Sequence, residues 1–297
     1  MTTIYKSEAG KQKVLAEYRQ ILADWPVASK QYPIPTSYGE TFVIESGDPG
    51  NPVLVLLHGS LSNSFSWYSD VSLLSQRFHV FAVDLLGEAG LSAEIRPDFQ
   101  SGAYEQWLDE VIAGLGITKC AIVGQSLGGW IALRYATIHP DKVSHLALLC
   151  PGGLARQRRD FLFRVLLRSI AARGDQSKVI KGVLGIENGG TRDTDDFRRA
   201  MDYILLINQY VKPRYATLPV FSGDELSRLT MPILVIFGEN DMLLNAKKSI
   251  ARIEHHAPSV TTILLPGTGH AVLGQAERIR DFIVPSTPIH TNNHPVA

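Results

Sequence analysis

Cysteine is scarce in this chain, which has only two, Cys120 and Cys150, among its 297 residues. Cys120 begins one short apolar segment, and Cys150 directly follows another. If these segments are neighbouring parallel strands, the sulfur atoms are separated by roughly 15–20 Å at ~3.3 Å per residue. A disulfide needs Cα atoms within about 7 Å. We therefore predict two free, buried thiols, and neither cysteine has a partner at the spacing of a metal site.

The chain also lacks an excess of charge of either sign, because Lys plus Arg and Asp plus Glu both total 29. Without a basic excess, nucleic acid is not an expected partner. No apolar run approaches the ~20 residues of a membrane span, and the first residues contain no apolar signal-peptide region. We therefore expect a cytoplasmic protein without membrane contact, and the sequence leaves open whether it is a monomer or a homodimer.

Short, continuously apolar runs recur along most of the chain. A strand that is covered on both faces is apolar throughout, and helical patterns separate most of these runs. The alternation predicts an α/β fold, with a mostly parallel sheet flanked by helices. Ligands of such sheets bind beyond the carboxyl ends of the strands. The predicted strands are residues 53–57, 80–83, 120–123, 146–149, 233–237 and 262–265, and the predicted helices between them are 64–76, 101–115, 127–138 and 246–255.

Two regions depart from this alternation. Residues 7–25 carry apolar side chains at helical spacing and stop before Pro26, and an antiparallel hairpin is expected around residues 38–40. From 155 to 227 the pattern is helical throughout, which predicts a cap of helices over the carboxyl end of the sheet. The predicted organisation is an N-terminal helix and hairpin (1–52), a core (53–154 and 228–284), a helical cap (155–227) and a disordered tail (285–297).

The sequence Gly-Gln-Ser-Leu-Gly at residues 124–128 lies between a predicted strand and a predicted helix. Gly-x-Ser-x-Gly in that position is the nucleophile-elbow motif, in which Ser126 occupies a strained backbone conformation and the glycines leave room for the turn. The turn would expose Ser126 Oγ at the edge of the sheet and aim the Leu127 N–H at the same point. We predict Ser126 as a nucleophile, with a plain tight turn as the alternative.

A serine hydroxyl needs a base within hydrogen-bond reach and a group that orients this base. His270 follows the last predicted strand in a Gly-Thr-Gly loop, and we predict that it is the base; a structural role is the alternative. Asp241, in the loop after the predicted strand 233–237, is the predicted orienting acid. Glu239, in the same loop, is expected to be solvated. Asp84, which follows another strand, is the alternative acid and otherwise stabilises its turn. The order Ser, Asp, His is that of elbow-type hydrolases.

A developing oxyanion needs two hydrogen-bond donors that are already in place. The Leu127 N–H is one candidate. The second is expected in the His-Gly-Ser-Leu loop at residues 58–61, where Gly59 permits close approach of the backbone and the Ser60 N–H is the candidate donor. His58 is expected to hold this loop by hydrogen bonding rather than to act as the base.

These motifs together resemble the α/β-hydrolase superfamily, from about residue 53 to residue 280, with the loop and cap similar to small-molecule carboxylesterases and C–C bond hydrolases. The resemblance implies Ser126, Asp241 and His270 as a triad, with the N–H groups of Ser60 and Leu127 as oxyanion hole. Serine at position 126 argues against haloalkane dehalogenase or epoxide hydrolase chemistry, which needs a carboxylate nucleophile. One departure is Gly-Glu-Ala-Gly-Leu-Ser at 87–92, where many relatives have Gly-x-Gly-x-Ser.

The sequence therefore predicts a serine hydrolase that cleaves small carboxylic esters through an acyl-enzyme, without a cofactor or a metal. The same fold and triad could serve C–C bond hydrolysis, lactone or thioester hydrolysis, acyl transfer or perhydrolysis. The alternative of another class is a ligand-binding receptor with little turnover, but a pure binding protein has no need of an activated serine.

Overall fold

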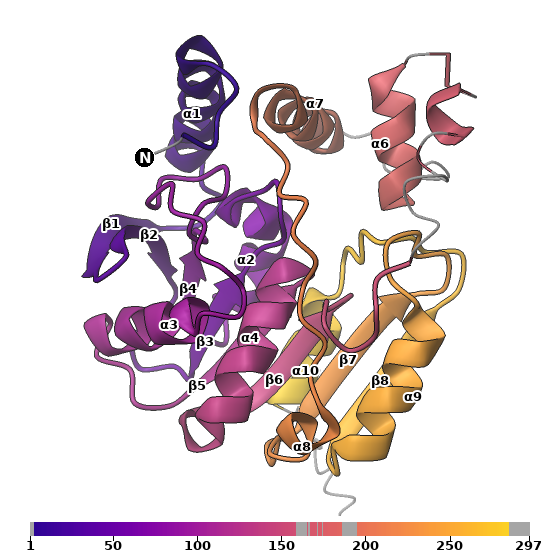
Figure 1. Ribbon diagram of the computed structural model, residues 1–297. Helices are drawn as coiled ribbons and strands as arrows, with labels where there is room; N and C mark the ends of the chain where they lie inside the picture. The colour runs from indigo at the N-terminus through magenta and orange to yellow at the C-terminus, as the bar shows by residue number, and fades with distance from the viewer. Residues whose placement is uncertain are drawn as a thin grey trace, which may run out of the picture.

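In the computed structural model, the described residues are 3–158, 165, 167–170, 172–173, 175–185 and 195–284. They form one eight-stranded sheet in the order β1-β2-β4-β3-β5-β6-β7-β8 (Figure 1). β1 pairs with β2 and β2 with β4 in antiparallel fashion, and every pairing from β4 to β8 is parallel. The strands are β1 (Ser29–Thr36), β2 (Gly39–Ser46), β3 (Val53–Leu57), β4 (His79–Val83), β5 (Cys120–Gln125), β6 (Val143–Leu149), β7 (Ile233–Gly238) and β8 (Val260–Leu265).

Helices cover both faces of this sheet. α3 packs against α4 and α8 against α9 on the face turned to the viewer in Figure 1, whereas α2 and α10 pack together behind the strands. The helices are α1 (Glu8–Ala23), α2 (Tyr68–Leu74), α3 (Ala103–Gly114), α4 (Leu127–Ile138), α6 (Gln176–Leu184), α7 (Asp195–Tyr210), α8 (Gly223–Leu226), α9 (Ala246–His256) and α10 (Ala276–Ile283), with short 3-10 helices η1 (Ser64–Trp67) and η2 (Pro140–Lys142).

The core lies where the central strands meet α4. The side chains of residues 54–57 on β3 are fully buried, and nearly all of the apolar α4 is buried as well. Burial on every side explains why these segments are apolar throughout rather than in alternation. The predicted mostly parallel α/β sheet is confirmed, as is the N-terminal hairpin that extends it. The short α10 was not predicted from the sequence.

Between β6 and β7 the chain leaves the sheet and forms α6 and α7. Figure 1 shows both helices beyond the end of the sheet from which the loops after β7 and β8 emerge. Leu184, at the end of α6, accepts the N–H of Ala271 (2.9 Å), and Tyr203 on α7 accepts a hydrogen bond from Asn63 Nδ2 (2.7 Å). The helices between β6 and β7 thus contact the loops after β8 and β3.

The return from α7 to the sheet is not helical. Residues 212–222 contain no helix, in contrast to the predicted pattern, because Pro213 and Pro219 interrupt it. Residues 159–164, 166, 171, 174 and 186–194 of the predicted cap, and the predicted disordered tail at 285–297, lie outside the described residues. None of the described helices is long and apolar enough to span a membrane.

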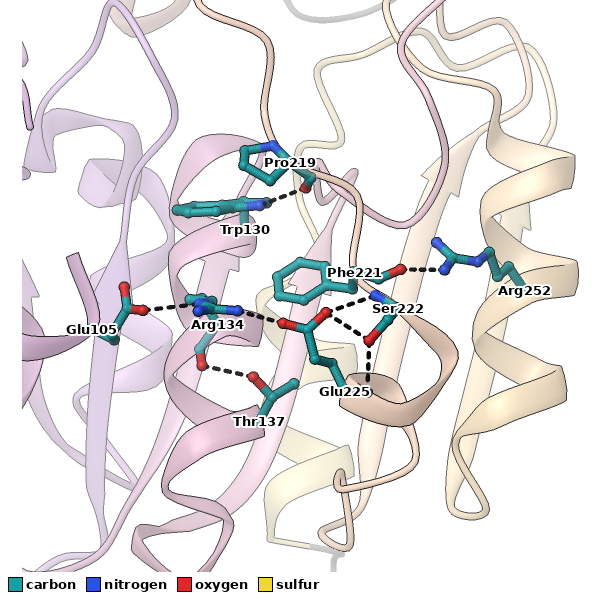
Figure 2. A network of polar contacts seen from close by, with 9 residues as sticks. All are labelled: Glu105, Trp130, Arg134, Thr137, Pro219, Phe221, Ser222, Glu225 and Arg252. Atoms are coloured by element: carbon teal, nitrogen blue, oxygen red, sulfur yellow. Dashed lines mark hydrogen bonds and ion pairs between the residues drawn. The ribbon is translucent and has the colours of Figure 1, made fainter. Parts of the chain in front are cut away.

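Polar contacts fasten this return segment to α4 and α9 (Figure 2). The indole N–H of Trp130 donates to the carbonyl of Pro219 (3.0 Å), and Arg252 donates to the carbonyl of Phe221. Arg134 on α4 bridges the carboxylates of Glu105 and Glu225, as Figure 2 shows. The helix that begins at the elbow is therefore tied to the end of the insertion.

Candidate active site

The backbone of Ser126 is strained. Ser126 lies between β5 and α4 with φ 51° and ψ −106°, in the positive-φ region that residues with a side chain rarely adopt. A Cβ at Gly128 would collide with the carbonyl oxygens of Leu57 and His58, and one at Gly124 would collide with the backbone of Gly128. The glycines of the motif are thus required by close packing of the backbone, and the turn places the serine at the carboxyl end of β5.

His270 lies between Ser126 and Asp241. Its Nε2 is 3.0 Å from Ser126 Oγ, and its Nδ1 is 2.7 Å from Asp241 Oδ2. The other oxygen of Asp241 accepts the N–H groups of Leu243 (2.8 Å) and Leu244 (2.9 Å), so its own loop fixes the carboxylate. With Nδ1–H donated to Asp241, the imidazole presents Nε2 as an acceptor for the serine proton.

Opposing influences act on the pKa of His270. Burial of the ring lowers the pKa, whereas the sulfur of Cys150 and the carboxylate of Asp241 raise it, and the net shift is well upward. The protonated ring is therefore stabilised where it stands. This stabilisation favours transfer of a proton from Ser126 to the ring, which is the requirement for activating a hydroxyl nucleophile.

Cys150 also contacts His270, and this contact was not predicted from the sequence. The thiol donates to the carbonyl oxygen of His270 (3.0 Å), and its sulfur is 4.0 Å from Nε2. Both cysteines are free and buried, as predicted. The available signal was the position of Cys150 immediately after β6, since the carboxyl ends of parallel strands share one edge of the sheet.

The loop after β3 lies beside Ser126. A Cβ at Gly59 would be 3.5 Å from the Cβ of Ser126, so the backbone passes close to the serine. Within the described part of the chain, no backbone or side-chain acceptor is hydrogen-bonded to the N–H of Ser60 or of Leu127. The two N–H groups thus have no acceptor among the described residues.

His58 holds this loop in place, in the role that the sequence analysis assigned to it. Its Nδ1 is 2.8 Å from the carbonyl oxygen of Gly59, and its Nε2 accepts the N–H of Leu85 (2.9 Å). Burial lowers the pKa of His58. The neutral ring, with Nδ1–H as donor, joins the loops after β3 and β4.

The other candidate acids have different surroundings. Asp84 accepts hydrogen bonds from the hydroxyl of Tyr18 (2.8 Å), from both Ser64 N–H (2.9 Å) and Ser64 Oγ (2.6 Å), and from Leu91 N–H (2.8 Å). These contacts stabilise the turns around it. Glu239 is exposed. Of the three acids, Asp241 is the one hydrogen-bonded to His270.

Comparison with known proteins places the chain in a family. The alpha/beta hydrolase family model matches residues 54–282, which is most of the chain. The chain belongs to the alpha/beta hydrolase family. Carboxylesterase YbfK of Bacillus subtilis is 26% identical to this hydrolase over 276 residues, covering 90% of each chain. An uncharacterized carboxylesterase of the same organism, nap, is 28% identical over 269 residues, covering 86% of this chain and 85% of that protein.

A solved esterase structure is also similar to this chain. The crystal structure of naproxen esterase (carboxylesterase NP) from Bacillus subtilis matches this alpha/beta hydrolase with a TM-score of 0.78 at 25% identity. The match covers 93% of this chain and 99% of that chain. The similarity therefore extends over most of this chain.

Proposed function

We propose that this alpha/beta hydrolase is a serine hydrolase of small carboxylic esters that works through an acyl-enzyme intermediate. Ser126 is the nucleophile, His270 the general base and then the general acid, and Asp241 the residue that orients the imidazole. The observation that carries the proposal is the pair of contacts of His270, 3.0 Å to Ser126 Oγ and 2.7 Å to Asp241 Oδ2. The carboxylesterase names of the relatives support the choice of an ester as substrate.

The reaction follows from these positions. Ser126 Oγ attacks the ester carbonyl while its proton passes to Nε2 of His270, and the imidazolium then protonates the departing alcohol. The N–H groups of Ser60 and Leu127 stabilise the oxyanion of each tetrahedral intermediate, and loss of one such donor typically costs on the order of 100-fold or more in kcat. Water activated by the same imidazole then releases the acid and restores Ser126.

The test is turnover of p-nitrophenyl acetate and butyrate by the wild-type protein and by Ser126→Ala and His270→Ala. Both substitutions are expected to reduce kcat by several orders of magnitude while the thermal unfolding midpoint stays close to that of the wild type. Equal turnover of these esters by the wild-type and Ser126→Ala proteins would contradict the proposal. A panel of lactones, thioesters and C–C bonded diketones, measured in parallel, compares the ester with the other bonds that this triad could cleave.

A further inference from the structure

Glu88 is a buried acid in the segment where the sequence departs from the pattern of many relatives, residues 87–92. Only 2% of its surface is exposed, and its Oε2 accepts the N–H of Leu61 (2.7 Å). Leu61 has φ 52°, a left-handed conformation that a leucine rarely adopts. Leu61 directly follows Ser60, so the carboxyl group of Glu88 holds a strained residue next to the Ser60 N–H.

The contacts on either side show what Glu88 adds. Upstream, His58 ties its own loop to Leu85 through Nε2 (2.9 Å). Downstream, Ala89 donates its N–H to the carbonyl of Ser62 (3.2 Å) and accepts a hydrogen bond from Asn63 Nδ2 (2.7 Å). Residues 60 and 61 lie between these two attachments. Among the described residues, the bond from the Leu61 N–H to Glu88 is the only hydrogen bond that joins the backbone of residues 60 and 61 to the rest of the protein.

The hydrogen bond does not depend on the charge of Glu88. Burial raises the pKa of Glu88 to about 7, against the opposing influences of Arg96, the Leu61 N–H and Arg214. Both guanidinium groups donate elsewhere, Arg96 to the carbonyl of Gly87 (2.8 Å) and Arg214 to the hydroxyl of Tyr104 (2.6 Å). Because a carboxylate, a neutral carboxyl and an amide all offer an acceptor oxygen, glutamine can replace Glu88 in this contact.

We propose that Glu88 is a positioning residue of the oxyanion hole, which fixes residues 60–61 by accepting the Leu61 N–H and so keeps the Ser60 N–H aimed at the substrate carbonyl oxygen. The inference rests on the proposed function, because it needs an oxyanion formed on Ser126. Glu88 itself neither contacts the substrate nor transfers a proton. Its loss is therefore expected to affect the transition state more than the bound ester.

The test compares Glu88→Gln, which keeps an acceptor, with Glu88→Met, which removes it at similar length, and uses Glu88→Leu as a second variant without an acceptor. Glu94→Ala is the matched control, because Glu94 is a nearby acid that contacts Thr3, Ile4 and Lys11 rather than the loop after β3. Each protein is assayed for kcat and KM with p-nitrophenyl butyrate, for inhibition by an alkyl boronic acid that forms a tetrahedral adduct, and for its unfolding midpoint.

Glu88→Met and Glu88→Leu are expected to lower kcat on the order of 10- to 100-fold, with KM changed less than about threefold. The affinity of both variants for the boronic acid inhibitor is expected to fall by a factor similar to that of kcat. Glu88→Gln and Glu94→Ala are expected to stay within about threefold of the wild type. Folded Met and Leu variants with wild-type kcat and inhibitor affinity would overturn the positioning role, and so would a Gln variant as impaired as they are. Turnover that survives Ser126→Ala would instead remove the proposed function, and this inference with it.

Discussion

Asp84 and Asp241 are two buried carboxylates in loops at the same edge of the sheet, yet their surroundings differ. Both oxygens of Asp84 accept hydrogen bonds from its own neighbourhood, three of them from Tyr18 and Ser64. Asp241 uses one oxygen for its own loop and leaves the other for the ring of His270. Burial after a strand is therefore not enough to make an orienting acid; one oxygen must also remain free for the base.

The order of the strands decides which acid His270 can reach. β8, which leads to His270, pairs with β7, which leads to Asp241, whereas β4 and Asp84 lie on the far side of β3 and β5. This order differs from the order of the segments along the chain. The same difference gives predictions that separate the proposed orienting acid, Asp241, from Asp84, beginning with the largest effect.

Asp241→Asn is expected to lower kcat by roughly 10⁴-fold, because the amide favours the wrong tautomer of His270. Steady-state turnover of a nitrophenyl ester, with circular dichroism to verify folding, measures the effect. A loss smaller than tenfold in a folded Asp241→Asn protein would remove Asp241 from the proposed triad.

Asp84→Asn is expected to destabilise the protein by about 3 kcal/mol, since hydrogen bonds to a buried charge contribute ~1.5–3 kcal/mol and the amide cannot accept all four. The folded enzyme should keep kcat within about tenfold of the wild type. Urea unfolding followed by tryptophan fluorescence gives the free energy of unfolding, and turnover below the transition gives kcat. The opposite outcome, normal stability with a large loss of kcat, would exchange the roles of the two acids.

The pH dependence separates the same pair. The pKa of His270 is raised, and the base must be unprotonated, so kcat/KM of the wild type should increase with pH along a limb whose pKa lies above the ordinary histidine value of about 6.5. Asp241→Asn removes a charge that favours the imidazolium and should move this limb to lower pH by about 1–3 units. Asp84→Asn should leave the limb in place. A limb unmoved in Asp241→Asn would contradict the assigned contact.

Cys150→Ala tests a further contact of His270, the hydrogen bond that its carbonyl oxygen accepts from the Cys150 thiol. Loss of the hydrogen bond from the thiol to the carbonyl of His270 should cost about 1 kcal/mol in stability and lower kcat by roughly two- to tenfold, through looser placement of the ring. Cys120→Ala is the control, since this other buried thiol begins β5 at the opposite end of the sheet. Equal effects of the two substitutions on kcat would argue that Cys150 acts only through general packing.

Local patterns were enough to predict much of the fold. α4 runs over residues 127–138 and β3 over residues 53–57, as predicted. Both were predictable because an element that is buried along nearly its whole length has an almost entirely apolar sequence. The elbow at Ser126 was predictable for a similar reason, since the close backbone approach requires glycine at fixed positions. Asp241 and His270 were placed by the rule that functional loops follow parallel strands.

Contacts between distant residues were not accessible in this way. The hydrogen bonds from Cys150 to His270 and from Leu61 to Glu88 depend on which loops the sheet brings together. The identities of these residues do not predict either contact. Residues 212–222 carry apolar side chains that resemble a helical pattern, but their attachment to α4 and α9 is made largely through backbone carbonyls. Such contacts leave little trace in the identity of the residues that accept them.

Labelling with a fluorophosphonate tests the central claim, that His270 activates Ser126. With intact-mass measurement and peptide mapping, the wild type should gain a single adduct on Ser126, Ser126→Ala should gain none, and His270→Ala should react at least 100-fold more slowly. An adduct on another residue, or labelling of the Ser126→Ala protein at the wild-type rate, would contradict the account.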